Sequence, residues 1–263
     1  MSLHLPRAIA AYLRVALMVA VQYRSTFLAE AALAFAWVAW AILPLLVVFQ
    51  YADGIEGWTR DQAFLVVGFF TILEGILGTF IDPNLRAVVE QVRDGTFDFT
   101  LLKPLDAQLQ VSIHRLRPTE IPHLLAGVVV VALAASRLPE WPSALQVGQA
   151  ALLLLFGTAT LHALWTVVVA TSFWFVKVDN LSVLLHTFID TGRWPVSFFS
   201  SGVRIFLTFV LPVGIMTTYP AMALRGTLDP GMILRAGVVA LVFVVGGRAV
   251  WSYALRHYTS ASS

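Results

Sequence analysis

Hydrophobic residues along the chain fall into long runs separated by short polar segments. A helix that crosses the hydrocarbon core of a bilayer needs about 20 apolar residues. Six runs meet this requirement and are predicted to span the membrane, at residues 27–49, 63–80, 118–138, 147–178, 196–216 and 232–251. At about 1.5 Å per residue, the fourth run is longer than a ~30 Å core requires, and we expect it to project into the cytosol.

The segment before the first run mixes apolar residues with Arg7, Arg14 and Gln22. This composition predicts a helix over residues 1–25 that lies in the membrane interface. The alternative is the polar end of a longer first span. Because Arg14 and Arg24 interrupt the apolar stretch, it does not read as a cleaved signal peptide, and we expect it to be retained.

Arginine and lysine set the expected orientation, because cytosolic segments carry an excess of both. With the N-terminus inside, the basic residues expected outside are Arg60, Arg137, Arg225 and Arg235. The cytosolic side then holds the larger set of Arg7, Arg14, Arg24, Arg86, Arg93, Lys103, Arg115, Arg117, Lys177, Arg193, Arg204, Arg248 and Arg256. This bias predicts that both termini lie in the cytosol.

Composition agrees with the hydropathy pattern. Of 263 residues, 59% are hydrophobic and 12% are charged, and the mean hydropathy is +0.81. The predicted fold class is therefore an all-α membrane protein, one transmembrane domain over 1–263. The chain has no cysteine, which excludes disulfides, thiol catalysis and thiolate metal sites. Its net charge of +2 is too small to indicate nucleic acid as a partner.

The longest polar interruption is the predicted cytosolic loop at 82–117. Asp82 is a good N-cap and Pro83 suits the first helical position, so we expect a helix to start there. Apolar residues with helical spacing follow, and Asp94 and Gly95 provide a stop. A second helix is expected to open at Asp106.

Between these two helices lies an unusually apolar run for a loop in water, residues 97–105. Two short helices around this Pro-containing turn predict a knob suited to a groove on a partner. The alternative is that the aromatic and leucine side chains, Phe97, Phe99 and Leu101, pack on the protein's own helix ends or on the membrane surface.

The sequence at 92–110 resembles the Gly-x-x-Asp-x-x-Leu-x-[Arg/Lys]-Pro-Leu pattern of ABC-2 type permeases, the membrane subunits of ABC exporters. The matching positions are Gly95, Asp98, Leu101, Lys103, Pro104 and Leu105. A second stretch, 193–226, is similar to the segment around the fifth span of the same family. Its landmarks are Pro195, Arg204, Pro212, Pro220 and Gly226.

This resemblance implies a half-transporter with six spans and a coupling-helix loop that docks an ABC ATPase subunit. The coupling residues it implies are Gly95, Phe97, Asp98, Phe99, Leu101, Lys103, Pro104 and Leu105. A second copy or a related permease completes the expected transporter. A phosphate-binding loop needs Gly-Lys-[Ser/Thr], but the two lysines follow Leu102 and Val176. We therefore expect ATP and Mg²⁺ on the partner subunit and no cofactor, metal or catalytic residue on this chain.

Three polar residues within the runs are candidates for a translocation path: Glu74, His162 and Arg204. A charge at bilayer depth costs roughly 2.5 to 3.5 kcal/mol and should face protein or water. Alternatively, Glu74 is protonated or paired, with Arg204 or His162 as its partner, and helps helices associate. Arg204 would otherwise snorkel to the cytosolic interface, and His162 would be a hydrogen-bonded core histidine.

Pro212, Pro220 and Gly226 break the helical pattern on the outer side. The resemblance implies a short re-entrant element there that closes the exit, and a plain surface loop is the alternative.

The leading hypothesis is the permease subunit of an ATP-driven exporter in the plasma (inner) membrane of a bacterium. Its apolar walls favour a lipidic or amphipathic substrate. The alternative is an ion- or proton-coupled transporter that uses Glu74. A membrane-embedded enzyme is disfavoured, because we find neither a metal-ligand cluster nor a nucleophile beside a base.

Overall fold

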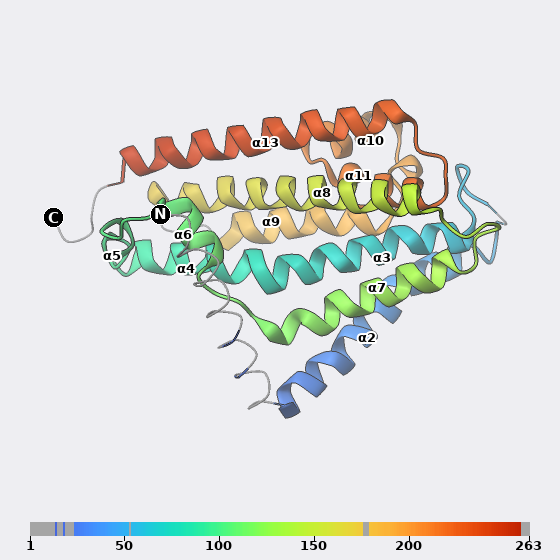
Figure 1. Ribbon diagram of the computed structural model, residues 1–263, viewed down its shortest axis with the longest axis horizontal. Helices are drawn as coiled ribbons and strands as arrows, with labels where there is room; N and C mark the ends of the chain where they lie inside the picture. The colour runs from blue at the N-terminus through green and yellow to red at the C-terminus, as the bar shows by residue number, and fades with distance from the viewer. Residues whose placement is uncertain (1–13, 15–17, 19–23, 53, 176–178, 259–263) are drawn as a thin grey trace.

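The computed structural model describes Arg14, Met18 and residues 24–52, 54–175 and 179–258. Its regular elements are all helices, and five helical segments are long and apolar enough to cross a membrane. They comprise α2 (Arg24–Val48), a continuous helix (Arg60–Arg93), η2 with α7 (Pro118–Ala135), α8 with η3 (Ala144–Phe173) and α13 (Pro230–Arg256). In Figure 1, α8 and α13 run lengthwise along the molecule, whereas α7 and α2 are inclined to them. The predicted all-α membrane fold is confirmed. The predicted interfacial helix at 1–25 falls almost wholly outside the described residues.

The second of these helices runs without a break from the membrane part into the predicted loop. It consists of α3 (Arg60–Ile76), a π-helical turn η1 (Leu77–Ile81) and α4 (Asp82–Arg93). The prediction that Asp82 caps a new helix is wrong, because the preceding residue is already helical and the buried Asp82 carboxylate accepts from Arg86 at 2.7 Å. The wider π turn lies directly before the proline of α4, which has no N–H to donate to the helix.

The helix stop predicted at Gly95 is confirmed. α4 ends one residue before Asp94, and Gly95 adopts a φ of +69°, a left-handed conformation that favours glycine.

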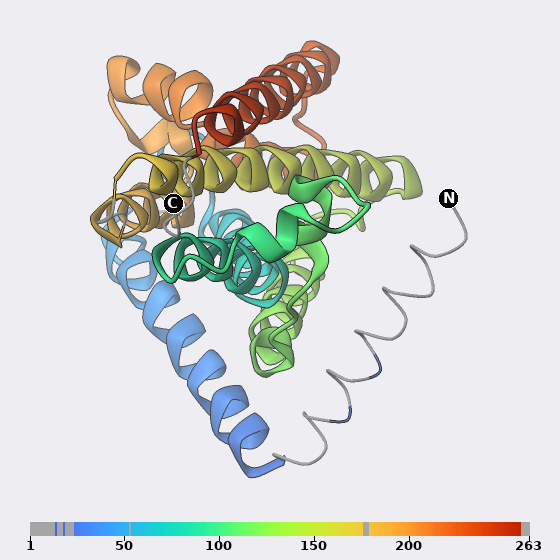
Figure 2. The ribbon, with the colours of Figure 1, turned by 90° about the vertical axis from the view of Figure 1, so that its left-hand side faces the viewer.

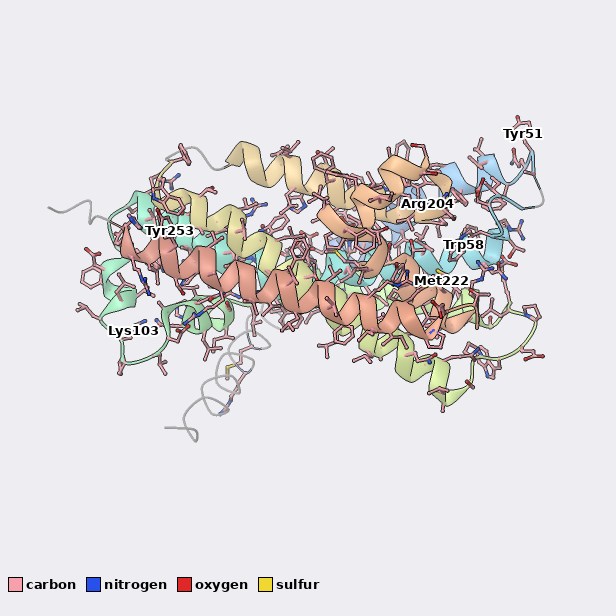
Figure 3. The ribbon with its side chains drawn as sticks, turned by 90° about the horizontal axis from the view of Figure 1, so that it is seen from above. Tyr51, Trp58, Lys103, Arg204, Met222 and Tyr253 are labelled. Atoms are coloured by element: carbon pink, nitrogen blue, oxygen red, sulfur yellow. The ribbon has the colours of Figure 1, made fainter. Side chains whose placement is uncertain are left out.

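The molecule has two distinct ends. Lys103 and Tyr253 lie at one end, which we call the loop end, while Tyr51 and Trp58 lie at the other, the Trp58 end (Figure 3). α8 and α13 both run from the Trp58 end to the loop end (Figure 1). As expected for its length, the helix that includes α8 extends far enough to contact α4.

The predicted fifth span at 196–216 is not a single helix. Two helical segments, Ser201–Val210 and Val213–Leu224, meet here at an angle of 70°. The elements of this region are α9 (Asp179–Ile189), η4 (Asp190–Arg193), η5 (Val196–Phe198), α10 (Ser201–Ile205), η6 (Phe206–Val210), α11 (Val213–Met216) and α12 (Thr218–Leu224).

The residues just before and just after this bent segment both contact the loop that contains Trp58, between α2 and α3. The Trp58 indole Nε1 donates to the Ser197 hydroxyl at 3.0 Å. After the bend, the Arg225 guanidinium stacks on the Trp58 ring at 4.4 Å and donates to the Gly57 carbonyl at 2.9 Å. Between these two contacts, the chain extends to α9, where the Phe206 ring lies 6.0 Å from the Phe188 ring between centroids. The bent segment therefore enters and leaves at the same end.

This path also corrects the position of Arg204. We expected it near the cytosolic interface, but it lies toward Trp58 and Met222, far from Lys103 (Figure 3). Its Nη2 donates to the carbonyl of Ser197 at 2.8 Å. Arg204 lies on the first arm of the bent segment, before the bend, and only a few residues after Ser197, which is hydrogen-bonded to Trp58.

α3 and α7 pack so closely that their backbones nearly touch. A Cβ added at Gly75 would lie 2.5 Å from Leu124 Cα, and one at Gly127 would lie 2.6 Å from the Ile72 nitrogen. Gly68 makes a third approach of this kind. Small residues allow such contacts, which hold helices together where lipid removes the hydrophobic drive for association.

We predict that Gly75→Ala destabilises the protein, because the added methyl group forces the α3 and α7 backbones apart. Overpacking of this kind costs about 1 to 3 kcal/mol. Thermal unfolding of the purified protein measures the effect. Gly246→Ala is the matched control, since it adds a methyl to a helix with nothing within 4 Å and should be neutral or slightly stabilising. Equal melting temperatures for the two variants would contradict this account.

Candidate functional site

The predicted knob, residues 97–105, lies at the loop end between α4 and α6 (Ala107–Ile113). It contains a short helix of its own, α5 (Asp98–Leu101). The helix start predicted at Asp106 is confirmed, because its carboxylate accepts from the Leu109 amide at 3.0 Å.

Phe97 anchors the knob in the protein core. Its side chain is 0% exposed, and its ring packs edge-on against Phe173 at 5.3 Å and Tyr258 at 5.6 Å between centroids. The Trp251 ring completes this aromatic cluster. For Phe97, the alternative of packing on the protein's own helix ends is therefore correct. Burial, together with the charge and hydrogen bond of Asp98, raises the pKa of the Tyr258 hydroxyl.

The remaining large apolar side chains of the knob point away from the protein. Leu102 is 80% exposed and Phe99 is 67% exposed, and Leu101, Leu105 and the adjacent Leu109 are also exposed. Lys103 lies on the same outer edge (Figure 3). One apolar run thus has two roles, because Phe97 fills the core while its neighbours form an apolar surface beyond the membrane helices.

Hydrogen bonds fix the segment that follows the knob, residues 106–117, to the long helix and to α13. The Asn84 side chain both donates to and accepts from the Arg115 backbone, and the Arg117 amide donates to the Thr79 carbonyl at 3.1 Å. On the other side, the Arg248 guanidinium pairs with the Asp106 carboxylate. The hydrogen bond from Arg248 outweighs burial and lowers the pKa of Asp106.

A second candidate site is a cavity of about 580 Å³ among the membrane helices. α2, α3, α7 and η4 form its walls, and α2 lies on the side of the bundle away from α13 (Figure 2). Its lining combines aromatic, apolar and ionisable side chains from Trp37, Val38, Trp40, Ala41, Phe70, Thr71, Glu74, His123, Asp190 and Arg193.

Four ionisable groups meet in this cavity as two pairs. The Glu74 carboxylate lies 3.6 Å from His123 Nε2, and the Arg193 guanidinium lies 3.1 Å from the Asp190 carboxylate. Arg193 also stacks over the Phe70 ring at 5.4 Å. Pairing reduces the cost of placing charges at bilayer depth, which is several kcal/mol for an isolated charge.

The structure gives Glu74 a different neighbour from the partners expected from the sequence. His123 pairs with it, whereas His162 lies 3.0 Å from the Ser112 hydroxyl. This contact agrees with a hydrogen-bonded core histidine. Arg204 bonds to backbone carbonyls at the Trp58 end, so neither His162 nor Arg204 lines this cavity.

Sequence reasoning missed three of the cavity's ionisable residues. His123 fell near the start of the predicted third span, and Asp190 and Arg193 fell in a predicted loop between spans. The only available signal was the three-residue spacing of Asp190 and Arg193, which places a carboxylate and a guanidinium on one face of a helical turn.

Two of the proline landmarks lie within the bent segment, and Gly226 follows it. Pro212 stands at the bend before α11, the buried Pro220 lies within α12, and Gly226 follows α12 with a φ of +73°. The segment packs closely on α8, where a Cβ at Gly157 would lie 2.8 Å from Met216 Cα.

A comparison with protein families gives one match, which covers nearly the whole chain. The family described as "ABC-2 family transporter protein" matches residues 35–262. No curated protein and no solved structure matches the chain significantly.

We predict that Asp106→Asn destabilises α6, the helix that follows the knob. Asparagine is also a good N-cap, so the variant removes only the charge pair with Arg248. The two side chains are 42% and 50% exposed, and such pairs contribute at most about 1 kcal/mol. Hydrogen exchange of the α6 amides should therefore accelerate by a modest factor.

Two controls test the assignment to the ion pair. Arg248→Gln should accelerate the same amides, and the double variant should add little. Because Arg248 lowers the pKa of Asp106 in the folded protein, the pair stabilises fully above the usual aspartate range and is lost as pH falls through the lowered pKa. Unchanged exchange in Asp106→Asn, or additive effects in the double variant, would show that the pair does not stabilise α6.

Proposed function

The chain belongs to the ABC-2 family of transporter proteins, and from this premise we propose that it is the permease subunit of an ATP-driven exporter. As a family member it is a membrane component of an ABC transporter. The proposal adds the direction of transport, the amphipathic class of substrate and the partners. Two permease subunits, identical or related, would work with two copies of an ABC ATPase that binds ATP and Mg²⁺.

The exposed knob supports the proposed contact with the ATPase. Its outward-facing side chains, led by Phe99 and Leu102, form an apolar patch on a loop beyond the membrane helices. The predicted coupling residues have two roles in this proposal. Phe97 holds the knob in place, and the exposed members of the set contact the ATPase. The set consists of Gly95, Phe97, Asp98, Phe99, Leu101, Lys103, Pro104 and Leu105.

The continuous helix supports a mechanical link between this contact and the membrane. α4 carries one side of the knob and α3 carries Glu74, so a displacement of the knob acts directly on the cavity wall. We therefore place the loop end in the cytosol and make the cavity part of the translocation path. The plasma membrane of a bacterium is the proposed location.

The bent segment supports the proposed closure at the Trp58 end. Pro212, Pro220 and Gly226 lie in a segment that enters and leaves at that end, and Ser197 and Arg225 tie it to Trp58. We propose that it is the re-entrant element that closes the exit and opens during alternating access.

Copurification tests the coupling proposal. The chain is coexpressed with the ATPase encoded in the neighbouring reading frame, and Leu102→Glu and Phe99→Glu are introduced separately. Each variant puts a charge into the proposed apolar contact, where truncating a hot-spot residue costs about 2 kcal/mol or more. We expect the native chain to retain the ATPase and both variants to lose it.

Tyr51→Glu is the matched control, because Tyr51 is an 87% exposed aromatic residue at the Trp58 end. It should retain the ATPase as the native chain does. Equal retention by the knob variants would refute the coupling role. Transport driven by a proton gradient without any ATPase would instead support a secondary transporter that uses Glu74.

A further inference from the structure

We propose that the cavity between α2, α3, α7 and η4 binds an amphipathic organic cation. The inference rests on the proposed function, in which this cavity belongs to the translocation path, and it adds the charge of the substrate. It follows from which of the lining side chains are held by the protein and which remain available to a ligand.

The carboxylates are the more accessible ionisable groups. The Asp190 side chain is 50% exposed and that of Glu74 is 31% exposed, against 25% for Arg193 and 16% for His123. A ligand that enters the cavity therefore meets negative groups first.

The Arg193 guanidinium is already engaged by contacts within the protein. Its guanidinium pairs with the Asp190 carboxylate, its Nε donates to the Asp190 carbonyl at 3.0 Å, and its plane lies over the Phe70 ring. These three contacts hold the guanidinium against the protein. Asp190 keeps one carboxylate oxygen beyond the atom that pairs with Arg193, and that oxygen can accept from a ligand.

Two indole rings complete the site. Trp37 and Trp40 both line the cavity and are 60% and 62% exposed. An aromatic face attracts a cation by about 0.5 to 2 kcal/mol, and tryptophan is the strongest of the aromatic side chains in this respect. The same rings and the apolar wall of Val38, Ala41 and Phe70 suit a hydrophobic body.

The size of the cavity agrees with a small amphipathic molecule. Pockets for small molecules usually have volumes of about 300 to 1,000 Å³, and this one has about 580 Å³. A ligand that carries its charge on an apolar body would satisfy the carboxylates at bilayer depth without requiring a bare ion to leave water.

A pair of probes that differ in the sign of the charge tests this inference. Tetraphenylphosphonium and tetraphenylborate have nearly the same size and shape. Each radiolabelled probe is bound separately to the purified full-length chain in nanodiscs, because the two ions would pair with each other in a mixture, and empty nanodiscs give the lipid background. We expect saturable binding of the cation and at least about tenfold weaker binding of the anion, because a carboxylate attracts the one charge and repels the other.

Isosteric variants assign the selectivity to the cavity. Glu74→Gln and Asp190→Asn should each weaken binding of the cation about fivefold, the loss of roughly one charge interaction. Glu140→Gln, which neutralises an exposed carboxylate at the Trp58 end, is the matched control and should bind as the native chain does. The comparison of the two probes on the native chain needs no variant, so it remains decisive if a substitution impairs folding.

The inference is wrong if the native chain binds neither probe, if it binds the anion as tightly as the cation, or if both variants bind the cation with native affinity. None of these measurements involves the ATPase. Loss of cation selectivity with intact ATPase copurification would therefore overturn this inference alone, and failure of the ATPase to bind would overturn only the coupling proposal.

Discussion

The backbone contact between α3 and α7 is the interaction on which both candidate sites depend. Gly68, Gly75 and Gly127 allow the two helices to meet with almost no side-chain separation. At such short distances, the two backbones gain more dispersion energy from each other than lipid chains would provide. They fix α3, and α3 then positions Glu74 within the cavity opposite His123 of α7. Since α3 continues into α4, the same contact also sets the direction of the knob.

The knob shows how a short apolar segment can be both stable and available. Phe97 closes an aromatic cluster with rings from η3, α13 and the segment after it, which secures the turn. Its neighbours, including Leu102, stay in contact with solvent. A solvent-facing apolar surface costs free energy unless something covers it. Because Phe97 is buried and Leu102 is exposed, the same short segment is anchored in the core and still presents apolar side chains to solvent, where polar loops are usual.

The cavity reflects the opposite constraint, because charges at bilayer depth must be paired or in contact with water. Glu74, His123, Asp190 and Arg193 come from three different parts of the chain and lie beside one another in two pairs. The pairs lie beside exposed indoles of α2, so the site presents both charge and apolar surface. This combination suits molecules with the same mixed character, the class of substrate that we propose for the transporter.

The sequence alone determined the membrane class, the helical fold, the stop at Gly95 and the cap at Asp106, because these depend on hydrophobic run length and on local backbone preferences. It also predicted a coupling motif through its resemblance to permeases. Tertiary structure decided the rest. The path of residues 196–224 depends on where Trp58 meets Ser197 and Arg225, and no local pattern encodes that meeting. Likewise, Phe97 and Leu102 look alike in a hydropathy pattern, and Glu74 and His123 are far apart in sequence. Their burial and pairing follow from long-range packing, which a single sequence does not display.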